Sequence, residues 1–598
     1  AGHDALIERQ HKVLDNMVDM RYITKEEAEA AKKVAILDTL KPLADQLEGI
    51  KAPHFVLMVR QQLEEELGKT VVGEGGLKVK TTLDIDVQTR LEQSMTQMFD
   101  GTMTDRNCGY RNCASYAGFS NGAAGIEDTK TGQLVALVGS RDFRYPGFGQ
   151  DNAATGYIQP GSSIKPLVYA QLFQNQGQGK TQYGSGSILS DTSTTFPQAP
   201  GWKPQTADGK FQGNINIRQA LDRSRNLPAI KAMAVNESNN PGSTWATIRA
   251  MGDKNYCTQG ADAQAGLSSA IGGCGTRLTD HLNAIASLGR QGAYVPQTTV
   301  LKVTNSSGQT LKEYKAQSKQ VIDPQSAYIV SDILADGKAR AGLGWNQDYM
   351  LKMNEIGAKV AVKTGTSNGQ IGSRAVPKDI WTVVYTPTLS MAVWLGNPDT
   401  TPLTQGNSLI PALFLDRTLA DVTKMYVEQG KAQFSDWYTA PSGIQKINNE
   451  LYPSYYNKAQ AQTNAKMVFD KVSKKKATNC TPESAKIEVS VTKVTDPISK
   501  QEIVTASDGY DATKDDDAHL CEDAKPTASI SSEGSGVSIT YTHGRYPLQS
   551  VEVRSGDKVV ASRQVSSDGS WKLSKKDLEA ASAGALTVTV TDTAYYTA

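Results

Sequence analysis

The sequence predicts a mixed α/β fold, of the α+β kind, within a chain of several domains. Its 598 residues exceed what one hydrophobic core usually holds. Between about residues 118 and 435, apolar runs with helical spacing accompany runs of β-branched and aromatic residues. From about residue 525, apolar and polar residues alternate between short turns, which is typical of a β-sandwich. We expect four regions: a helical and extended region at 1–110, an α/β domain at 111–440, a charged linker at 441–524, and a β-sandwich-like domain at 525–598.

The first region is predicted to be mostly helical. In "ITKEEAEAAKK", Thr24 and Glu27 have the spacing of a capping box at a helix start. In "PHFVLMVRQQLEEELGK", Pro53 suits the first turn of a helix and Gly68 suits its end. "LKVKTTLD" alternates like a strand, and the segment after it returns to helical spacing.

The α/β domain is predicted to contain two groups of strands. "GAAGIEDTKTGQLVALVGS" indicates two strands joined by a polar turn, and "AKVAVKTGT", "IWTVVYTP" and "LSMAVWLGN" indicate three adjacent strands. Helices are expected between the two groups. After residue 440, charged stretches such as "KVSKKKATNCTPESAK" are typical of solvated linkers.

The charge balance argues against nucleic acid as a partner. The chain has 63 lysine and arginine residues and 62 aspartate and glutamate residues, so its net charge is +1. No apolar run has the length of a membrane span, and "AGHDALIERQHK" lacks the features of a signal peptide. We therefore expect that this chain neither spans a membrane nor carries its own export signal.

The six cysteines suggest three local pairs: Cys108 with Cys113, Cys257 with Cys274, and Cys480 with Cys521. Other connectivities and unpaired buried thiols remain alternatives. Disulfides would indicate an extracytoplasmic setting. None of the six histidines has zinc-finger spacing, so we expect neither a metal nor a cofactor.

A Ser-x-x-Lys pattern suited to acyl transfer occurs at Ser162 to Lys165, where a helix is expected to begin. On one helical turn the lysine amine can take the proton of the serine hydroxyl, and free amide groups there favour negative charge. Three further copies begin at Ser473, Ser490 and Ser555, in a polar run, a strand and a turn. The alternative for Ser162 is a helix cap beside a solvated lysine.

A Ser-x-Asn pattern occurs between two apolar helical segments, at Ser224 to Asn226. Such a polar break can line a cleft, with a hydroxyl for proton relay and an amide for a substrate backbone. Capping at a helix junction is the alternative. A second copy, Ser238 to Asn240, is expected in a loop.

Lys-Thr-Gly occurs twice, at Lys130 to Gly132 in the predicted turn and at Lys363 to Gly365 at the end of a predicted strand. In the second copy, Lys363 would supply positive charge and Gly365 would permit close approach. Thr364 and Thr366 would offer hydroxyls to a carboxylate. Only this copy follows the other two patterns in the order known for serine acyl transferases.

The stretches "GYIQPGSSIKPLVYAQLF", "IRQALDRSRNLPAIKAM" and "AVKTGTSN…IWTVVYTPTLSMAVWLGN" resemble the transpeptidase domain of class A penicillin-binding proteins. "MRYITKEEAEAAKK" and "VRQQLEEELGKTVVGEGGLKVKTTLDIDVQTRLEQ" resemble the segment that joins this domain to the family's glycosyltransferase domain. The resemblance covers about residues 5 to 430. It implies a penicillin-binding or serine β-lactamase-like fold, a mostly antiparallel sheet flanked by helices.

The resemblance also implies a reaction, in which a D-alanyl-D-alanine stem peptide acylates the serine and is then transferred to another stem's amine. Ser162 would be the nucleophile and Lys165 its proton acceptor. Ser224 and Lys363 would carry protons to the leaving amine. The substrate contacts would come from Asn226, Thr364, Gly365 and Thr366, with an oxyanion hole formed by the amides of Ser162 and Thr366.

The implied partners are peptidoglycan stem peptides and β-lactams, with a glycosyltransferase domain and a membrane anchor in the parent protein. The implied location is the outer face of the cytoplasmic membrane. No transglycosylase-like motif precedes residue 20, so we expect the polymerising domain to be missing from this chain.

Four rival functions remain to be weighed. A Ser-His-Asp hydrolase would need His281, which we expect on a helix surface. A serine β-lactamase shares the three motifs but would not need the helical region before the α/β domain or the region after it. A D,D-carboxypeptidase uses water as the acceptor, which motifs cannot distinguish from an amine. A non-catalytic wall scaffold that binds β-lactams would not need intact motifs.

Overall fold

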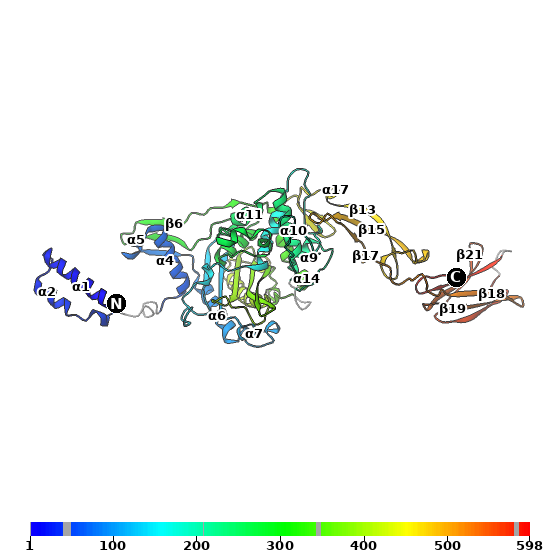
Figure 1. The fold of residues 1–598 in the computed structure, drawn as a ribbon, viewed down its shortest axis with the longest axis horizontal. Helices are drawn as coiled ribbons and strands as arrows, with labels where there is room; N and C mark the ends of the chain where they lie inside the picture. Colours follow the sequence, from blue (N-terminus) through cyan, green and yellow to red (C-terminus); the bar gives the residue numbers. More distant parts are fainter. Residues whose placement is uncertain (1, 40–48, 207, 343–347, 579–584) are drawn as a thin grey trace.

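The computed structural model describes residues 2–39, 49–206, 208–342, 348–578 and 585–598, arranged along an elongated molecule (Figure 1). Helical segments form one end, the α/β domain lies in the middle, and two β-rich regions form the other end. The first elements are α1 (Gly2–Asp19), α2 (Lys25–Lys32), η1 (Ile36–Thr39), α4 (Pro53–Leu67), α5 (Lys69–Gly73) and β1 (Lys78–Thr81). The predicted capping box of Thr24 and Glu27, the position of Pro53 in a first turn and the cap at Gly68 are confirmed.

The central domain is built on a five-stranded antiparallel sheet in the order β3-β2-β10-β9-β8. Its strands are β2 (Asn121–Asp128), β3 (Leu134–Val138), β8 (Ala361–Ile371), β9 (Arg374–Tyr385) and β10 (Leu389–Gly396). β8, β9 and β10 are the three adjacent strands expected from the sequence. The predicted mixed α/β class is confirmed.

Helices cover both faces of this sheet. On one face, α12 (Leu278–Gly289) contacts β2, β9 and β10, and on the other face α6 (Ile85–Asp100) and α16 (Leu409–Glu428) pack on β3, β9 and β10. Successive strand residues point to opposite faces, so the sheet has a separate hydrophobic core on each side.

The other elements of this domain lie around the sheet. The helices are η2 (Arg106–Cys108), α7 (Cys113–Ala117), η3 (Ala153–Thr155), η4 (Gly161–Ile164), α8 (Lys165–Leu172), α9 (Ile217–Asp222), α10 (Asn226–Asn239), α11 (Ser243–Met251), η5 (Gly260–Gln264), η6 (Gly266–Ile271), α13 (Pro324–Leu334), α14 (Gly337–Arg340) and α15 (Leu351–Glu355). The short strands are β4 (Ala293–Tyr294), β5 (Val300–Thr304), β6 (Thr310–Glu313) and β7 (Lys319–Gln320). β1 joins the sheet β1-β5-β6, which ties the N-terminal region to this domain.

The expectation of a charged linker at 441–524 is wrong, because most of this region folds into strands. A five-stranded sheet has the order β16-β15-β13-β14-β17. Its core is small, with Phe469, Val489 and Val491 buried, and most of its other strand residues are charged or polar. Because of this charged and polar composition, the sequence did not predict the strands. The elements are β11 (Gln445–Ile447), β12 (Glu450–Tyr452), α17 (Lys458–Ala461), β13 (Thr463–Asp470), β14 (Lys475–Lys476), η7 (Glu483–Ala485), β15 (Lys486–Thr495), β16 (Glu502–Ala506) and β17 (Asp511–Asp515).

The C-terminal region contains two three-stranded sheets, β18-β19-β22 and β21-β20-β23, around one shared core. The predicted β-rich domain is thus present. Its strands are β18 (Thr527–Glu533), β19 (Gly536–Thr542), β20 (Leu548–Ser555), β21 (Lys558–Gln564), β22 (Gly569–Leu573) and β23 (Leu586–Asp592).

Three disulfides join the cysteine pairs expected from the sequence, Cys108–Cys113, Cys257–Cys274 and Cys480–Cys521. Within the described residues, no helix combines the length and the apolar character that crossing a membrane requires.

Candidate active site

The turn that carries Ser162 packs closely on β8, the edge strand of the central sheet. Gly161 has a φ of +54°, a left-handed conformation that glycine adopts without strain. A Cβ on Gly161 would lie 2.2 Å from the carbonyl oxygen of Thr366, and one on Gly365 would lie 2.2 Å from that of Pro160. Glycine at both positions therefore brings the turn against the strand, and Ser162 is half-buried there.

Lys165 begins α8, one 3-10 turn after Ser162, so the two side chains lie on the same side of the chain. Lys165 is fully buried. Its Nζ donates to the carbonyl oxygen of Ser224 at 2.6 Å and to Oδ1 of Asn226 at 2.8 Å. Burial, aided by the positive charge of Lys363, holds the pKa of Lys165 well below its ordinary value. The sequence placed the start of an α-helix at Gly161, but a 3-10 turn precedes the α-helix there.

Ser224 lies in the break between α9 and α10 with a φ of +55°, in the left-handed region that is unusual for a non-glycine residue. Nζ of Lys363, on β8, donates to Oγ of Ser224 at 2.8 Å and to the carbonyl oxygen of Thr364 at 2.7 Å. Burial lowers the pKa of Lys363 to about 7. The three sequence patterns thus meet in one hydrogen-bonded group.

The remaining predicted residues border this group. Asn226 donates from Nδ2 to the carbonyl oxygen of Gln205 at 2.8 Å, so its side chain also holds a neighbouring loop. Thr364 and Thr366 share one face of β8 by the alternation of the strand. Thr366 is half-exposed, whereas Thr364 is only 2% exposed. Thr366 is therefore the more accessible hydroxyl.

The other copies of the patterns lie elsewhere. Lys130 is exposed in the turn between β2 and β3, as expected. Ser490 lies in β15 and Ser473 follows β13, both outside the central domain. Ser238 was expected in a loop but lies in the last turn of α10, because that helix continues through the polar residues after Val235.

A family model described as the penicillin-binding protein transpeptidase domain matches residues 122–412. These residues form a penicillin-binding transpeptidase domain. This match, together with relatives of the 1A type, confirms the resemblance seen in the sequence.

The chain spans about half the length of the curated relatives it matches. It is 28% identical over 411 residues to penicillin-binding protein 1A of Clostridium acetobutylicum, covering 66% of this chain and 46% of that protein. It is 28% identical over 396 residues to penicillin-binding protein 2D of Bacillus subtilis, covering 65% and 51%.

Solved structures of penicillin-binding proteins share the fold. Penicillin-binding protein 1A of Haemophilus influenzae matches with a TM-score of 0.52 and 18% identity, over 74% of this chain and 79% of that chain. PonA1 of Mycobacterium tuberculosis matches with a TM-score of 0.50 and 24% identity, over 65% of this chain and 94% of that chain.

A Ser-His-Asp arrangement that the sequence did not predict lies directly behind Ser162. Nε2 of His281 is 2.9 Å from Oγ of Ser163, and its Nδ1 is 3.5 Å from Oδ2 of Asp253. Ser163 and His281 are fully buried, so the expectation that His281 lies on a helix surface is wrong. Oγ of Ser163 also donates to the carbonyl oxygen of Pro160 at 2.9 Å. Because a substrate cannot reach it, this set supports the turn rather than acting as a hydrolase triad.

Arg225, between Ser224 and Asn226, is a second residue with a role that the sequence pattern did not predict. Its Nε donates to Asp191 at 2.7 Å and one of its terminal nitrogens to Asp208 at 2.9 Å. Arg225 is buried and Asp191 fully so. This ion pair fixes the break between α9 and α10 and thereby the strained backbone of Ser224. An arginine among polar residues is usually exposed, so the sequence did not indicate that Arg225 is buried in an ion pair.

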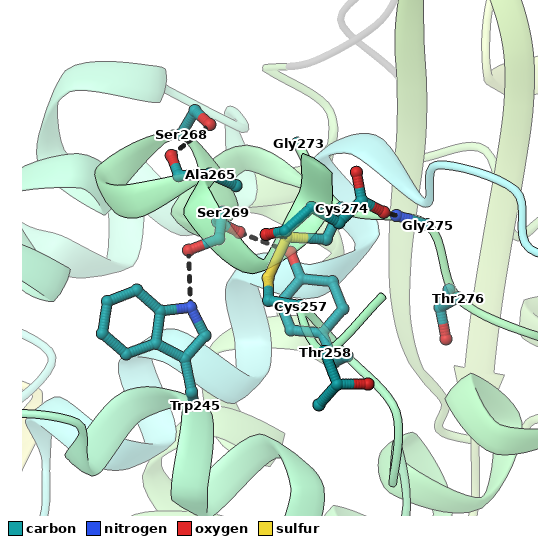
Figure 2. The surroundings of a disulfide bond; sticks show 12 residues. Trp245, Cys257, Thr258, Ala265, Ser268, Ser269, Gly273, Cys274, Gly275 and Thr276 are labelled. Atoms are coloured by element: carbon teal, nitrogen blue, oxygen red, sulfur yellow. Dashed lines mark hydrogen bonds between the residues drawn. A yellow bond between two sulfur atoms is a disulfide. The ribbon is translucent and has the colours of Figure 1, made fainter. Parts of the chain in front are cut away.

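The disulfide between Cys257 and Cys274, drawn with its surroundings in Figure 2, encloses a segment that contains η6. The helix η6 packs on η4, the turn that carries Ser162. Tyr256, the residue before Cys257, donates from its hydroxyl to the carbonyl oxygen of Ser269 at 2.6 Å. A Cβ on Gly272 would lie 2.2 Å from the carbonyl oxygen of Gly161. The bridge therefore holds a segment in which Gly272 lies against Gly161, the residue before Ser162.

Proposed function

We propose that this chain is a peptidoglycan D,D-transpeptidase that cross-links stem peptides through an acyl-Ser162 intermediate and is inhibited covalently by β-lactams. The observation that carries the proposal is the hydrogen-bonded group of Lys165, Ser224, Asn226 and Lys363 beside the turn of Ser162. The transpeptidase family match supports the reaction class. A homologous structure, PonA1 of Mycobacterium tuberculosis, is described in complex with penicillin V.

The contacts of Lys165 suit a proton acceptor. A neutral amine has two hydrogens and one lone pair. The carbonyl oxygen of Ser224 and Oδ1 of Asn226 take the two hydrogens, at 2.6 and 2.8 Å. The lone pair is then free to accept the proton of Ser162, and the lowered pKa of Lys165 favours this neutral form. Ser162 Oγ would then attack the carbonyl carbon of the penultimate D-alanine.

The contacts of Lys363 suit the return of a proton to the leaving group. Its ammonium donates to Oγ of Ser224 at 2.8 Å, which leaves the hydroxyl hydrogen of Ser224 free to point toward the departing D-alanine amine. As the bond to this amine breaks, Ser224 gives up its proton and Lys363 replaces it. The amine of a second stem then attacks the acyl carbonyl carbon and gives a proton to Ser224, which passes its own to Lys363. As the ester bond to Ser162 breaks, Lys165 returns the first proton to Oγ of Ser162.

The substrate contacts are proposed from the remaining pattern residues. Thr366, with Thr364 beneath it, would bind the terminal carboxylate, and the charge of Lys363 would attract it. Asn226 would bind the substrate backbone, and Gly365 would permit its close approach to β8. The amides of Ser162 and Thr366 would stabilise the oxyanion. We further propose an extracytoplasmic location and a membrane-anchored parent protein with a glycosyltransferase domain.

The test is labelling with a penicillin, read by intact mass and peptide mapping. We expect a single label on Ser162, none in Ser162→Ala, and normal labelling in Ser473→Ala, which removes the serine of another Ser-x-x-Lys copy. Label that persists in Ser162→Ala would overturn the assignment. Incubation with a stem peptide, with and without an acceptor amine, then distinguishes cross-linking from hydrolysis, and release of D-alanine without any cross-linked product would favour a carboxypeptidase.

A further inference from the structure

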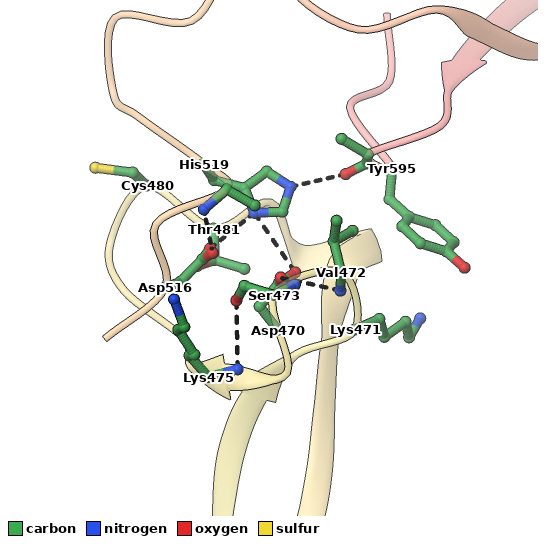
Figure 3. Close-up of polar contacts among 12 residues, drawn as sticks. Asp470, Lys471, Val472, Ser473, Lys475, Cys480, Thr481, Asp516, His519 and Tyr595 are labelled. Atoms are coloured by element: carbon green, nitrogen blue, oxygen red, sulfur yellow. Dashed lines mark hydrogen bonds and ion pairs between the residues drawn. The ribbon is translucent and has the colours of Figure 1, made fainter. Parts of the chain in front are cut away.

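Three side chains that are common metal ligands meet far from the transpeptidase site, at the junction of the two C-terminal β-rich regions (Figure 3). Asp470 ends β13, Asp516 directly follows β17, and His519 lies three residues further on. Asp470 and His519 are fully buried and Asp516 is 8% exposed. Their candidate ligand atoms all lie within 4.8 Å of one another.

The ring of His519 is held in an orientation typical of a metal ligand. Its Nε2 lies 2.8 Å from the carbonyl oxygen of Ala594, which accepts only, so Nε2 carries a hydrogen. Nδ1 then faces the two carboxylates, 2.7 Å from Oδ2 of Asp516 and 3.4 Å from Oδ1 of Asp470. Metal-bound histidines usually donate their second ring nitrogen to a carbonyl or carboxylate in this way.

Asp470 supplies an independent sign of a missing ligand. Its Oδ2 accepts from the backbone nitrogen of Val472 at 2.9 Å, but its Oδ1 is buried without a hydrogen-bond partner. A buried carboxylate oxygen without a donor is costly, since burial removes its hydration. Asp516 is held from behind in a similar way, because Oδ1 accepts from the nitrogen of Ala518 at 2.9 Å. Oδ2 of Asp516 also accepts from Oγ1 of Thr481 at 2.6 Å, so among the oxygens that face the ring only Oδ1 of Asp470 lacks a donor.

The cluster needs a positive charge that its neighbouring lysines do not supply. Lys475 pairs with the exposed Asp517, and Nζ of Lys471 donates to the carbonyl oxygen of Ser484 at 2.7 Å. When Nδ1 of His519 carries no hydrogen, its lone pair and the two ionised carboxylates repel one another at these distances. A cation among the three atoms removes this repulsion.

We propose that Asp470, Asp516 and His519 bind one divalent transition-metal cation of the zinc type. Zn²⁺ takes oxygen and imidazole nitrogen ligands at about 2.0–2.2 Å, so tetrahedral ligand atoms lie about 3.3–3.5 Å apart. The separation of Asp470 Oδ1 and His519 Nδ1, 3.4 Å, meets this requirement. Asp516 Oδ2, at 2.7 Å from Nδ1, would move outward by about 0.6 Å on binding.

The position of the site gives it a structural role. The same histidine ring bonds to Ala594, which follows β23 of the C-terminal domain, and the disulfide Cys480–Cys521 lies beside the cluster. A bound cation would therefore fix the junction between the β13–β17 sheet and the C-terminal domain. The sequence contains no zinc-finger spacing because Asp470 comes from a segment well before the one that carries Asp516 and His519.

The experiment uses the full chain after chelator treatment. Zn²⁺ affinity is measured by competition with a chromophoric chelator, and Co²⁺ serves as a visible-absorption probe of coordination. We expect one Zn²⁺ per chain, and affinity at least tenfold weaker in Asp470→Asn and His519→Gln. Asp470→Asn keeps an oxygen for the amide of Val472, so it tests the ligand with the least disturbance of folding. His543→Gln is the matched control, because His543 pairs with Asp568 at 2.8 Å but is exposed.

The outcomes are distinct. A Co²⁺ spectrum that is lost in Asp470→Asn but kept in His543→Gln supports the site. Absence of Zn²⁺ binding by the folded wild-type chain, or binding that is equal in wild type and Asp470→Asn, overturns it. The first of these results would mean that a proton on His519 supplies the charge. Penicillin labelling of Ser162 is independent of this test.

Discussion

Lys165 and Lys231 are both fully buried, on helices α8 and α10 that pack together, but different oxygen atoms surround them. Lys165 donates to a carbonyl oxygen and an amide oxygen, both uncharged. Lys231 donates to Oδ2 of Asp496 at 2.7 Å and to Oγ of Ser190 at 2.6 Å. A carboxylate offsets the desolvation of an ammonium group far better than uncharged oxygens do. The hydrogen-bond partner, more than the burial, thus separates the structural Lys231 from Lys165, which is proposed to act as a base.

The surroundings of Lys231, unlike those of Lys165, also connect two regions of the molecule. Asp496 lies in the turn between β15 and β16, so its pair with Lys231 links the β13–β17 sheet to the transpeptidase domain. Burial lowers the pKa of both lysines, but Asp496 opposes the effect on Lys231, whereas Lys363 adds to it on Lys165. This contrast can be tested by changing each lysine in turn.

The largest effect is expected from Lys165→Arg. Arginine keeps the positive charge but cannot accept a proton, so acylation by penicillin should fall by about 10³- to 10⁴-fold. The fold should survive, as read from the melting temperature and the circular dichroism spectrum. Acylation within tenfold of wild type in folded protein would show that Lys165 is not the base.

Lys231→Met should lower the stability of the fold but leave the acylation rate nearly unchanged. It leaves Asp496 buried without its partner, which should lower the free energy of unfolding by about 3–5 kcal/mol. The acylation rate of the folded fraction should stay within about threefold of wild type, because none of the proposed reaction steps involves Lys231. Urea unfolding and the labelling rate measure the two quantities.

The control for that variant is Lys231→Met combined with Asp496→Asn, which removes the unpaired charge and should recover part of the stability. If Lys231→Met keeps the stability of wild type but loses acylation activity as Lys165→Arg does, then Lys231 is not the purely structural lysine of the pair.

A smaller effect is expected from Lys363→Ala, which removes a charge from the site. Acylation should fall by about 10²-fold. In wild type the rate should also fall as the pH rises through about 7, because Lys363 then loses the proton that it is proposed to relay. Lys363→Ala should lack this pH dependence, which is measured as labelling rate against pH.

Lys130→Ala is the matched control, since it alters the other Lys-Thr-Gly copy in an exposed turn. Its stability should change by no more than about 0.5 kcal/mol and its labelling rate should be unchanged. Slow labelling by Lys130→Ala beside normal labelling by Lys363→Ala would mean that the wrong strand was assigned to the site.

The sequence was least informative where charged residues dominate. The region 441–524 was predicted to be a linker because lysine and aspartate are frequent, yet its strands pair across a core of a few apolar residues. His281 was assigned to a helix surface from its polar neighbours in sequence, but α12 is buried nearly all round. In both cases the burial of a residue depends on elements that sequence neighbours do not reveal.

The sequence by itself determined the order of elements in the α/β domain and the three patterns around Ser162, Ser224 and Lys363, and it suggested the cysteine pairs without excluding other connectivities. These features depend on the spacing of residues that are close in sequence, so they can be recognised without the structure. The tertiary structure alone decided which atoms surround each lysine, because Lys165 and Ser224 are 59 residues apart and Lys363 and Ser224 are 139 apart. It also decided that Ser163, His281 and Asp253 meet behind the turn and that Asp470, Asp516 and His519 meet at the C-terminal junction. The pKa of a buried group depends on such distant partners, so only packing could set it.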